Sequence, residues 1–415
     1  MYLIYDDTVH EELYMDIFQI CERYGFQVNR FEVTTEDGYI LSLYRLQKHN
    51  RDFDHLSTPK LDHEKFDEME IDGNGNLIPN QKQINQTIGK PVLFIHGNNQ
   101  AVEDWLLNGI NSPAIILGNE GYDVWLAQNR GGRTSRKHKW LQHETNSSDS
   151  KKYWDFSWQE MGDYDLPAFI EQIKKENKVH KKIAYIGLSQ GVGQGFYAFS
   201  GGCKANETRQ QYYRDNISIM ISLASTVKFY NTDSYFLRTL NYLQSKFSHY
   251  ISEKMLSDEP RFSNWFCHKF SKICEFKFYI ACDGALGLYD YNAFRLFGSK
   301  PEAGTSIRSV YHPMQLTTVD RWQCFDFGEQ INLDVYQSET VPEIQIHQIK
   351  DIPIAIFQGK YDKFTGAKDI EWLKNSLNHT IVFYKEYELG HATFQIAKDM
   401  SYFKYDVVSV LKQYL

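Results

Sequence analysis

The sequence predicts an α/β fold in which helices cover both faces of a mostly parallel central sheet, with a helical cap inserted late in the chain. Short apolar runs, typical of strands buried on both faces, alternate with longer segments of helical character. This alternation is typical of a parallel sheet between two layers of helices. The alternation of strands and helices stops between about residues 227 and 330, where the chain is aromatic and helical, and then resumes.

The elements of this fold are expected in a definite order along the chain. Two alternating strands within residues 30–45, joined at Asp37-Gly38, predict a hairpin. Ser157 and Glu160 stand at the spacing of a helix-capping box. Strands are expected at residues 91–95, 122–126, 182–187, 217–223, 352–357 and 380–384, and the first two are expected to be buried on both faces. Helices are expected at residues 11–26, 157–177, 189–200, 366–377 and 400–414.

Residues 47–89 differ from the rest because they are rich in Asp, Glu, Asn, Gln and Gly and lack periodicity, which predicts a long surface insertion. Within it, Leu77 and Gln83 stand where a calcium loop needs Gly and Glu, so we predict no metal site there.

We expect residues 1–226 to form the first part of the core, 227–330 the cap or lid, and 331–415 the second part of the core.

Charge and hydropathy limit the partners and the compartment. The net charge is −8, and no large basic cluster is present, so we expect no nucleic-acid partner. No apolar run approaches the roughly 18 residues of a membrane span, so we expect no transmembrane segment. The first residues are apolar but are soon followed by Asp6 and Asp7, so no signal peptide is visible. A cytoplasmic protein and a chain without its leader both stay open, and the oligomeric state is unknown.

Cysteines and glycosylation sequons say little by themselves. Three of the six cysteines, Cys267, Cys274 and Cys282, lie close together without the C-x-x-C spacing of zinc or redox sites. One local disulfide with a free thiol and three reduced cysteines are both compatible with this spacing. Sequons, which support a secretory route only weakly, occur at Asn85, Asn146, Asn206, Asn216 and Asn378.

Ser189 is the candidate nucleophile because it stands in a G-x-S-x-G pattern, at residues 187–191. An apolar strand precedes the pattern and a helix follows it, as in the nucleophile elbow of α/β-hydrolases. The tight turn places the serine at the strand end, and the flanking glycines let the strand and the helix approach closely. Further glycines at residues 193 and 195 are expected to continue that close packing.

Asp362 and His391 are the candidate acid and base. A serine hydroxyl is a poor nucleophile until a base removes its proton, and in this fold the acid and the histidine follow the serine in that order. Each stands just after a predicted strand, where an open parallel sheet builds its site. Most of the 14 histidines are expected to be structural, and Asp351, Asp369 and Glu388 are rival acids. Order and strand-end placement together favour Asp362 and His391.

Two backbone N–H groups are needed to bind the oxyanion of the tetrahedral intermediate. One is expected from Gln190, directly after the nucleophile, and the other from Asn98, in the loop after the first buried strand. His96, at the start of that loop, is expected to be structural.

Beyond these residues, the chain resembles the acid lipase family, which includes gastric and lysosomal acid lipases, over residues 10–46 and 88–415. The 29-residue spacing from Asp362 to His391 also fits the family. The segments that carry the resemblance are residues 33–41, 121–126, 129–131, 156–161, 164–167, 189–191 and 303–306.

The resemblance implies an α/β-hydrolase fold and hydrolysis of neutral lipid esters, triacylglycerols or cholesteryl esters, at a lipid–water interface. It implies no metal and no organic cofactor, a mobile lid over the site, and a lysosomal or secreted glycoprotein. The family's cysteine pattern implies a bridge between Cys267 and Cys274, with Cys282 free.

The chain also departs from the family near the site. It has Leu188 where the family has His, a different sequence around His391, and polar residues at Asn98-Asn99 where the family is apolar. The polar pair keeps open a carboxylesterase that acts on soluble esters. The changed neighbours keep open a non-catalytic subunit of the same fold, although the intact Ser189, Asp362 and His391 argue against it.

Overall fold

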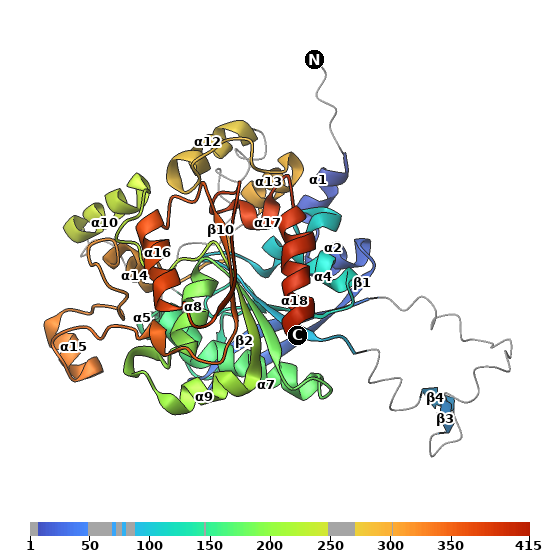
Figure 1. Ribbon diagram of the computed structural model, residues 1–415, viewed down its shortest axis with the longest axis horizontal. Helices are drawn as coiled ribbons and strands as arrows, with labels where there is room; N and C mark the ends of the chain where they lie inside the picture. Colours follow the sequence, from blue (N-terminus) through green and yellow to red (C-terminus); the bar gives the residue numbers. More distant parts are fainter. Residues whose placement is uncertain are drawn as a thin grey trace.

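The computed structural model describes residues 7–48, 69–71, 77–79, 88–144, 147–247, 270–300 and 302–415, and a mixed sheet lies at its centre (Figure 1). The main order of its strands is β1-β2-β6-β5-β8-β9-β10-β11, and β7 pairs with β2 beside this path. The strands are β1 (Phe26–Thr34), β2 (Tyr39–Lys48), β5 (Pro91–Ile95), β6 (Asp123–Gln128), β7 (Lys137–His138), β8 (Ile183–Leu188), β9 (Ile217–Leu223), β10 (Ile354–Gly359) and β11 (Ile381–Tyr387).

The sheet is parallel from β6 through β5, β8, β9 and β10 to β11. β1 and β2 form the antiparallel hairpin expected at Asp37-Gly38, and β2 joins the parallel part by pairing antiparallel with β6. Every residue of β5, β6, β8 and β10 is buried, as the continuous apolar runs predicted. The predicted α/β class is therefore confirmed.

Helices cover both faces of the sheet, and each face has its own apolar core. The helices α2, α4 and α18 lie on one side of the sheet and α7, α8, α9 and α16 on the other (Figure 1), and the side chains of each group belong to a separate core. The helices are α1 (Asp7–Tyr14), α2 (Ile17–Arg23), α4 (Pro113–Asn119), α5 (Ser150–Tyr153), α6 (Trp158–Glu160), α7 (Leu166–Glu176), α8 (Gln190–Phe199), α9 (Glu207–Asn216), α10 (Tyr235–Phe247), α12 (Ser271–Ala281), α13 (Tyr291–Ser299), α14 (Ile307–Gln315), α15 (Glu329–Tyr336), α16 (Ala367–Ser376), α17 (Thr393–Ile396) and α18 (Val408–Tyr414).

Three segments predicted as single helices are interrupted. The segment 400–414 forms a π-helical stretch at Tyr402–Val407, followed by α18. The segment 11–26 forms α1 and α2, because the side chain of Asp16 accepts the Gln19 N–H at 2.9 Å and starts a new helix. The segment 157–177 forms α6, a π-helical turn at Met161–Asp165 and α7. Pro167 lies in the first turn of α7 and has no N–H to donate to a continuing helix. The capping box at Ser157 and Glu160 forms as predicted.

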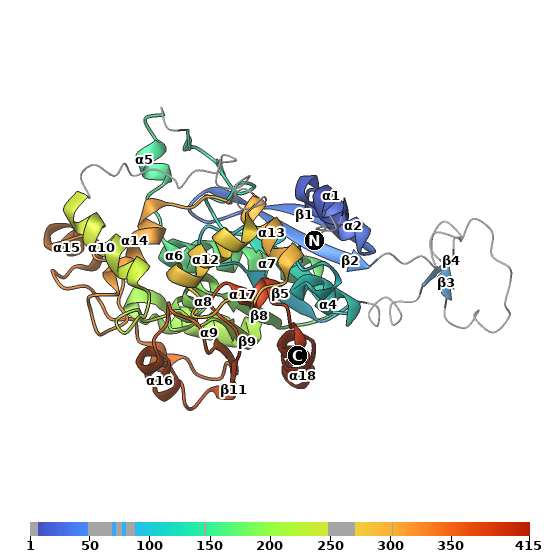
Figure 2. The same ribbon diagram turned by 90° about the horizontal axis from the view of Figure 1, so that it is seen from above.

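The two predicted insertions are described to different extents. In the segment 47–89, strands β3 (Met69–Ile71) and β4 (Leu77–Pro79) pair antiparallel, whereas most of the expected surface loop lies outside the described residues. The described residues of 227–330, called the cap segment below, contain α10, α12, α13 and α14 and no strand of the sheet. Seen from above in Figure 2, these helices extend from α10 and α14 on the left to α12 and α13 over the middle of the core.

In the part of the chain that the structure describes, no helix combines the length and the apolar character that a membrane span needs.

Candidate active site

Ser189 lies in the sharp turn between β8 and α8. Its backbone has φ 53° and ψ −117°, an unfavourable region for a residue with a side chain. The Ser189 N–H donates to the Leu223 carbonyl oxygen at the end of β9, at 3.1 Å, which ties the turn to the neighbouring strand. The turn therefore has the strained geometry that G-x-S-x-G predicts.

The glycines of the pattern allow the close approach that this turn requires. A side chain at Gly191 would place its Cβ 2.5 Å from the Ile95 carbonyl oxygen, and one at Gly187 would lie 2.8 Å from the Gly191 backbone. Gly195 faces the ring of Tyr185 in the same way, at 2.8 Å. Leu188, between the first glycine and Ser189, is buried in the apolar core, so this position contributes packing.

His391 connects Ser189 to Asp362 through two hydrogen bonds. Its Nδ1 lies 2.9 Å from Asp362 Oδ2, and its Nε2 lies 2.7 Å from Ser189 Oγ. A carboxylate only accepts, so Nδ1 carries the proton and Nε2 presents its lone pair to the Ser189 hydroxyl. The imidazole packs against the ring of Phe364, with the two centroids 4.5 Å apart. The arrangement can remove the hydroxyl proton and hold it on Nε2.

Asp362 is oriented by the backbone of its own loop. Its Oδ1 accepts the Phe364 N–H at 2.8 Å and the Thr365 N–H at 3.4 Å, which leaves Oδ2 facing His391. Asp362 is 7% exposed and His391 is 6% exposed, so bulk water competes little for the hydrogen bond between them.

The rival acids make contacts elsewhere. Asp369 accepts the backbone and side-chain N–H groups of Asn231, at 2.8 and 2.7 Å. Glu388 forms an exposed ion pair with Lys360 at 2.7 Å. Asp351 is exposed in a left-handed turn before β10. Asp362 is the acid that faces His391.

The structure brings the two expected oxyanion donors beside Ser189. Asn98, Ser189 and Gln190 line one cavity. Gln190 is the first residue of α8, where backbone N–H groups have no partner inside the helix. Asn98 lies in the loop after β5, and its Nδ2 donates to the Ser309 carbonyl oxygen at 3.0 Å, so the cap segment holds this loop in place.

His96 is structural, as expected. Its Nδ1 lies 2.7 Å from the Gly97 carbonyl oxygen, and its Nε2 accepts the Asn129 N–H at 3.2 Å. Burial lowers the pKa of His96 to about 4, so the ring is neutral at physiological pH. These contacts fix the base of the loop that carries Asn98.

The cavity beside Ser189 is apolar. It has a volume of about 210 Å³ and is lined mainly by side chains from the cap segment, α6 and the loop after β9. Its apolar lining includes Trp158, Val227, Phe229, Leu237, Leu240, Val310, Met314, Leu316 and Trp322. The serine hydroxyl therefore opens into a chamber suited to a hydrocarbon chain.

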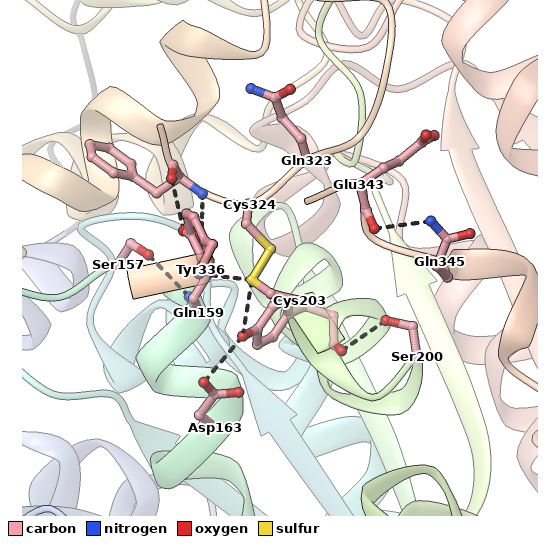
Figure 3. The surroundings of a disulfide bond; sticks show 12 residues. Ser157, Gln159, Asp163, Ser200, Cys203, Gln323, Cys324, Tyr336, Glu343 and Gln345 are labelled. Carbon is pink, nitrogen blue, oxygen red and sulfur yellow. Dashed lines mark hydrogen bonds between the residues drawn. A yellow bond between two sulfur atoms is a disulfide. The ribbon is translucent and has the colours of Figure 1, made fainter. Parts of the chain in front are cut away.

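A disulfide between Cys203 and Cys324 ties the wall of this cavity to the core (Figure 3). Gln159 supports the same junction, because its Nε2 donates to Cys203 Sγ at 3.3 Å and its Oε1 accepts the Phe325 N–H at 2.5 Å. This bridge was not predicted from the sequence. The two cysteines are 121 residues apart, and no local spacing marks such a pair.

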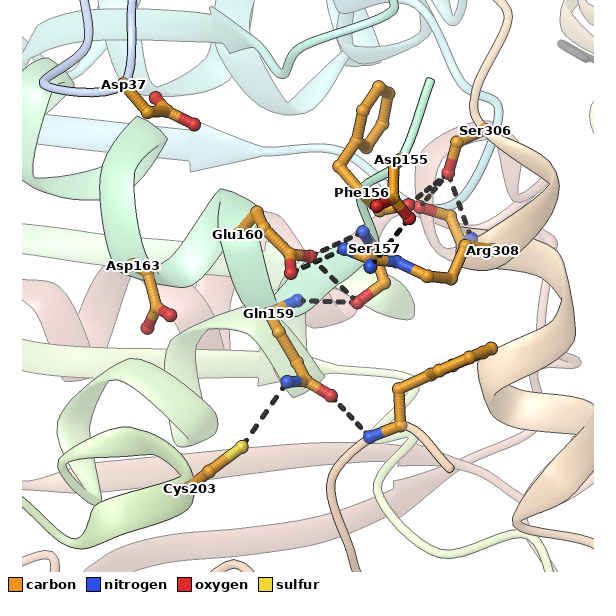
Figure 4. A network of polar contacts seen from close by, with 12 residues as sticks. Asp37, Asp155, Phe156, Ser157, Gln159, Glu160, Asp163, Cys203, Ser306 and Arg308 are labelled. Atoms are coloured by element: carbon orange, nitrogen blue, oxygen red, sulfur yellow. Dashed lines mark hydrogen bonds and ion pairs between the residues drawn. The ribbon is translucent and has the colours of Figure 1, made fainter. Parts of the chain in front are cut away.

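Arg308 forms a second junction between the cap segment and the core (Figure 4). It pairs with Glu160 at 2.5 Å and with Asp155 at 2.9 Å. Burial alone would raise the pKa of Glu160, but the Arg308 charge and the Ser157 N–H outweigh it, so the pKa is lowered. Next to this junction, Trp158 stacks on His312 with the ring centroids 4.2 Å apart. The cavity wall formed by the cap segment is therefore attached to the core by ion pairs as well as by the disulfide.

The predicted local bridge lies partly outside the described residues. Cys267 is not described, so its pairing with Cys274 stays a prediction, although Cys274 is disulfide-bonded. Cys282 is a buried free thiol, as the resemblance implied.

Comparisons with known proteins show that the chain is similar to lipases. Residues 17–109 match the family described as the partial α/β-hydrolase lipase region. Lipase member K of Homo sapiens is 29% identical over 99% of this chain and 94% of its own. Gastric triacylglycerol lipase of Rattus norvegicus is 28% identical over 90% of this chain and 85% of its own. Gastric triacylglycerol lipase of Homo sapiens is 27% identical over 97% of this chain and 92% of its own.

A solved esterase of Pyrococcus furiosus covers 95% of this chain and 93% of its own, with 16% identity and a TM-score of 0.45. The parallel sheet, the strand–turn–helix at Ser189 and the lipase relatives that extend over nearly the whole chain lead to one assignment. The chain is a carboxylic ester hydrolase with an α/β-hydrolase fold, and over nearly its whole length it is similar to lipases of the acid lipase family.

Proposed function

We propose that the chain hydrolyses neutral lipid esters, such as triacylglycerols or cholesteryl esters, through an acyl-enzyme on Ser189. One observation carries the proposal. The hydrogen-bonded series from Asp362 through His391 to Ser189 ends at an apolar cavity of about 210 Å³.

In the first half of the proposed reaction, Ser189 Oγ attacks the ester carbonyl carbon while His391 Nε2 takes the hydroxyl proton. The oxyanion that forms is held by the backbone N–H groups of Asn98 and Gln190. When the tetrahedral intermediate collapses, the bond to the alcohol oxygen breaks and His391 returns the proton to that oxygen. The alcohol leaves, and the acyl group stays on Ser189.

In the second half, water attacks the acyl carbon, and His391 takes a proton from that water. The new oxyanion collapses, the bond to Ser189 Oγ breaks, and the proton returns to the serine. The products are a carboxylic acid and the regenerated enzyme. Asp362 holds the Nδ1–H tautomer of His391 and stabilises the imidazolium that appears in both halves.

The apolar surface around the cavity supports a lipid substrate. Large side chains on two cap helices are exposed, which is typical of surfaces that contact lipid or protein. The exposed fractions are 83% for Tyr235, 44% for Phe236, 56% for Ile273, 51% for Phe276 and 51% for Ile280. Phe236 also lines the cavity. The cap segment then acts as a lid through which a lipid surface delivers its ester.

The disulfides support a secreted or lysosomal location. Cys203–Cys324 and the bonded Cys274 require an oxidising compartment during folding. The sequons at Asn206 and Asn378 are exposed, whereas Asn216 is buried at the end of α9. Two sequons are therefore accessible to glycosylation in the described residues.

The test is ester hydrolysis by the purified chain over short and long acyl chains, with and without a lipid emulsion. We expect long-chain activity that rises when the emulsion forms. Ser189→Ala removes this activity, whereas Ser200→Ala, at the far end of the same helix, retains it. Ser200 is also buried and donates to the Tyr197 carbonyl oxygen at 2.9 Å, so it controls for loss of a buried hydroxyl.

The same experiment separates the alternatives. Activity restricted to short soluble esters favours the carboxylesterase and contradicts the lipase proposal. The polar pair that motivates this alternative is already engaged, because Asn98 bonds to Ser309 and Asn99 donates to Glu302 at 2.6 Å. A folded chain that is inactive on every ester favours the non-catalytic subunit.

A further inference from the structure

Asp283 is a second buried carboxyl at the catalytic loops, and the reaction proposed above does not use it. It follows α12 in the cap segment and has no exposed surface. Its Oδ1 accepts the Ala392 N–H at 3.2 Å, and its Oδ2 accepts the Tyr289 hydroxyl proton. The cap segment thus contributes a carboxylate to the loop that carries His391.

The loop around His391 is shaped to receive this carboxyl. A side chain at Gly390 would place its Cβ 2.2 Å from Asp283 Oδ1, so the glycine leaves the space that the carboxyl fills. The next residue after Gly390 is His391 itself. The carboxyl therefore contacts the main chain on both sides of the base.

The same cap segment also holds the loop of Asp362. Asp283 and Asp362 form an isolated antiparallel bridge. On either side of it, the Gly284 N–H donates to the Tyr361 carbonyl oxygen at 2.6 Å, and the Lys363 N–H donates to the Cys282 carbonyl oxygen at 2.9 Å. One short segment therefore contacts both loops, and Asp283 reaches the base loop with its carboxyl group.

The ionisation of Asp283 leaves its hydrogen bonds in place. Burial raises the pKa of Asp283 to about 7, although the Ala392 N–H and the charge of His391 favour the ionised form. A protonated carboxyl still accepts from Ala392 through one oxygen and donates to the Tyr289 oxygen through the other. The titratable groups that face Asp283 are Asp362, His391, Tyr289 and Cys282.

We propose that Asp283 is a positioning residue for the reaction: it fixes the main chain at 390–392 and so aims the imidazole of His391 between Asp362 and Ser189. The inference rests on the proposed role of His391 as the base. It makes the cap segment a structural part of the catalytic site as well as its cover.

Two isosteric substitutions separate hydrogen bonding from packing. In Asp283→Asn, the amide oxygen accepts from Ala392 and the amide nitrogen donates to the Tyr289 oxygen, so we expect kcat within about threefold of the wild-type value. In Asp283→Leu, the volume stays but both hydrogen bonds are lost. Because a misplacement of about 1 Å costs roughly a hundredfold in rate, we expect kcat to fall by about that factor with little change in KM.

Asp163 provides the matched control. Like Asp283, it accepts a tyrosine hydroxyl, from Tyr197 at 3.1 Å, but it is only partly buried and pairs with Arg209 away from the cavity. Neither Asp163→Asn nor Asp163→Leu is expected to change kcat more than about threefold in protein that remains folded. A general effect of removing a buried carboxyl would instead lower kcat in both series.

A second measurement does not depend on turnover. The His391 Nδ1 proton, hydrogen-bonded to Asp362, is expected to give a low-field proton resonance in wild type and Asp283→Asn, assigned by its absence in His391→Gln. We expect it to shift or broaden in Asp283→Leu. If the chain hydrolyses no ester, this resonance still reports the positioning of His391, so the two proposals fail separately.

The kcat values and the His391 resonance decide whether Asp283 positions His391. Wild-type kcat and an unchanged resonance in Asp283→Leu would overturn it. Equal losses in Asp283→Asn and Asp283→Leu would also overturn it, because the carboxylate charge would then matter and the hydrogen bonds would not. If Asp283→Leu does not fold, Gly390→Ala tests the same contact, since its Cβ displaces the carboxyl. Normal kcat in folded Gly390→Ala would contradict the proposal.

Discussion

Asp362 holds the imidazole of His391 with one oxygen while two backbone N–H groups hold the other oxygen. In Asp362→Asn, the amide fits the same space but favours the wrong tautomer of His391. We expect kcat to fall by about 10⁴-fold, measured on a soluble ester. Asp369→Asn is the control, because Asp369 is equally buried but bonds to Asn231. If kcat of Asp362→Asn falls less than tenfold, Asp362 is not the acid of the reaction.

Asp104 predicts a pH dependence of stability that is independent of catalysis. It is buried and accepts the Ala101 N–H at 3.1 Å, and burial raises its pKa to about 7. A folded-state pKa above the unfolded value near 4 means that the folded chain binds the proton more tightly. The stability from this proton is full below about pH 4 and is lost as the pH rises through about 7.

We therefore expect wild type to lose stability relative to Asp104→Asn between about pH 4 and pH 7, by on the order of 2–4 kcal/mol. Urea unfolding of both proteins at several pH values measures this difference. Asp334→Asn, at an exposed position on α15, is the control substitution. A constant difference between wild type and Asp104→Asn across this range would show that Asp104 does not titrate as its burial implies.

Residues that depend on local sequence were predictable, and those that depend on distant contacts were not. Ser189 stands in a strand–turn–helix pattern, and Asp362 and His391 follow predicted strands, so strand order was enough to nominate them. Asp283 escaped prediction because its role arises only when the cap segment folds onto the loops after β10 and β11. Nothing adjacent to it in the sequence indicates that contact.

At the scale of elements, strands were predicted better than helix boundaries. Continuous apolar runs indicate buried strands, and the expected strands form within a few residues of their predicted bounds. Helix interruptions depend on single residues. Asp16 starts a new helix where periodicity predicted one continuous helix, and the π-helical turn at Met161–Asp165 precedes Pro167.

The junction of the cap segment with the core predicts an effect on stability. Removing the Cys203–Cys324 disulfide in the paired Cys203→Ser, Cys324→Ser variant should lower the free energy of unfolding by about 2–5 kcal/mol, because it closes a long loop. Thermal unfolding of the oxidised proteins measures the change. Cys21→Ser is the control, since Cys21 is a buried free thiol. If Cys21→Ser lowers the free energy of unfolding as much as the paired variant does, the loss comes from replacing buried cysteines and not from breaking the bridge.

At the scale of the whole molecule, the exposed apolar side chains of the cap are proposed to face a lipid surface. We expect Phe276→Ser with Ile280→Ser to lower activity on emulsified long-chain ester several-fold while activity on a soluble ester stays unchanged. Val382→Ser is the control, because Val382 is 39% exposed at the opposite end of the sheet, where β11 begins. Parallel losses on both substrates would indicate damage to the site and contradict a role in interfacial binding.

The overall architecture followed from the sequence because strand and helix alternation is a property of the whole chain. The cap segment was predicted from the interruption of that alternation, and this division stays a prediction. Its attachment was not predicted, because it uses a disulfide and ion pairs between residues more than 100 positions apart. The pairing of β3 with β4 was also missed, because short strands in a polar segment leave no apolar periodicity.

The most direct test of the central claim is labelling of the folded chain with a serine-directed phosphonate, followed by mass spectrometry of the modified peptide. We predict one modification, on Ser189, that is retained in Ser200→Ala and greatly slowed in His391→Gln. A folded wild-type chain that resists labelling, or that is labelled at another serine, would contradict the claim that Ser189 is an activated nucleophile.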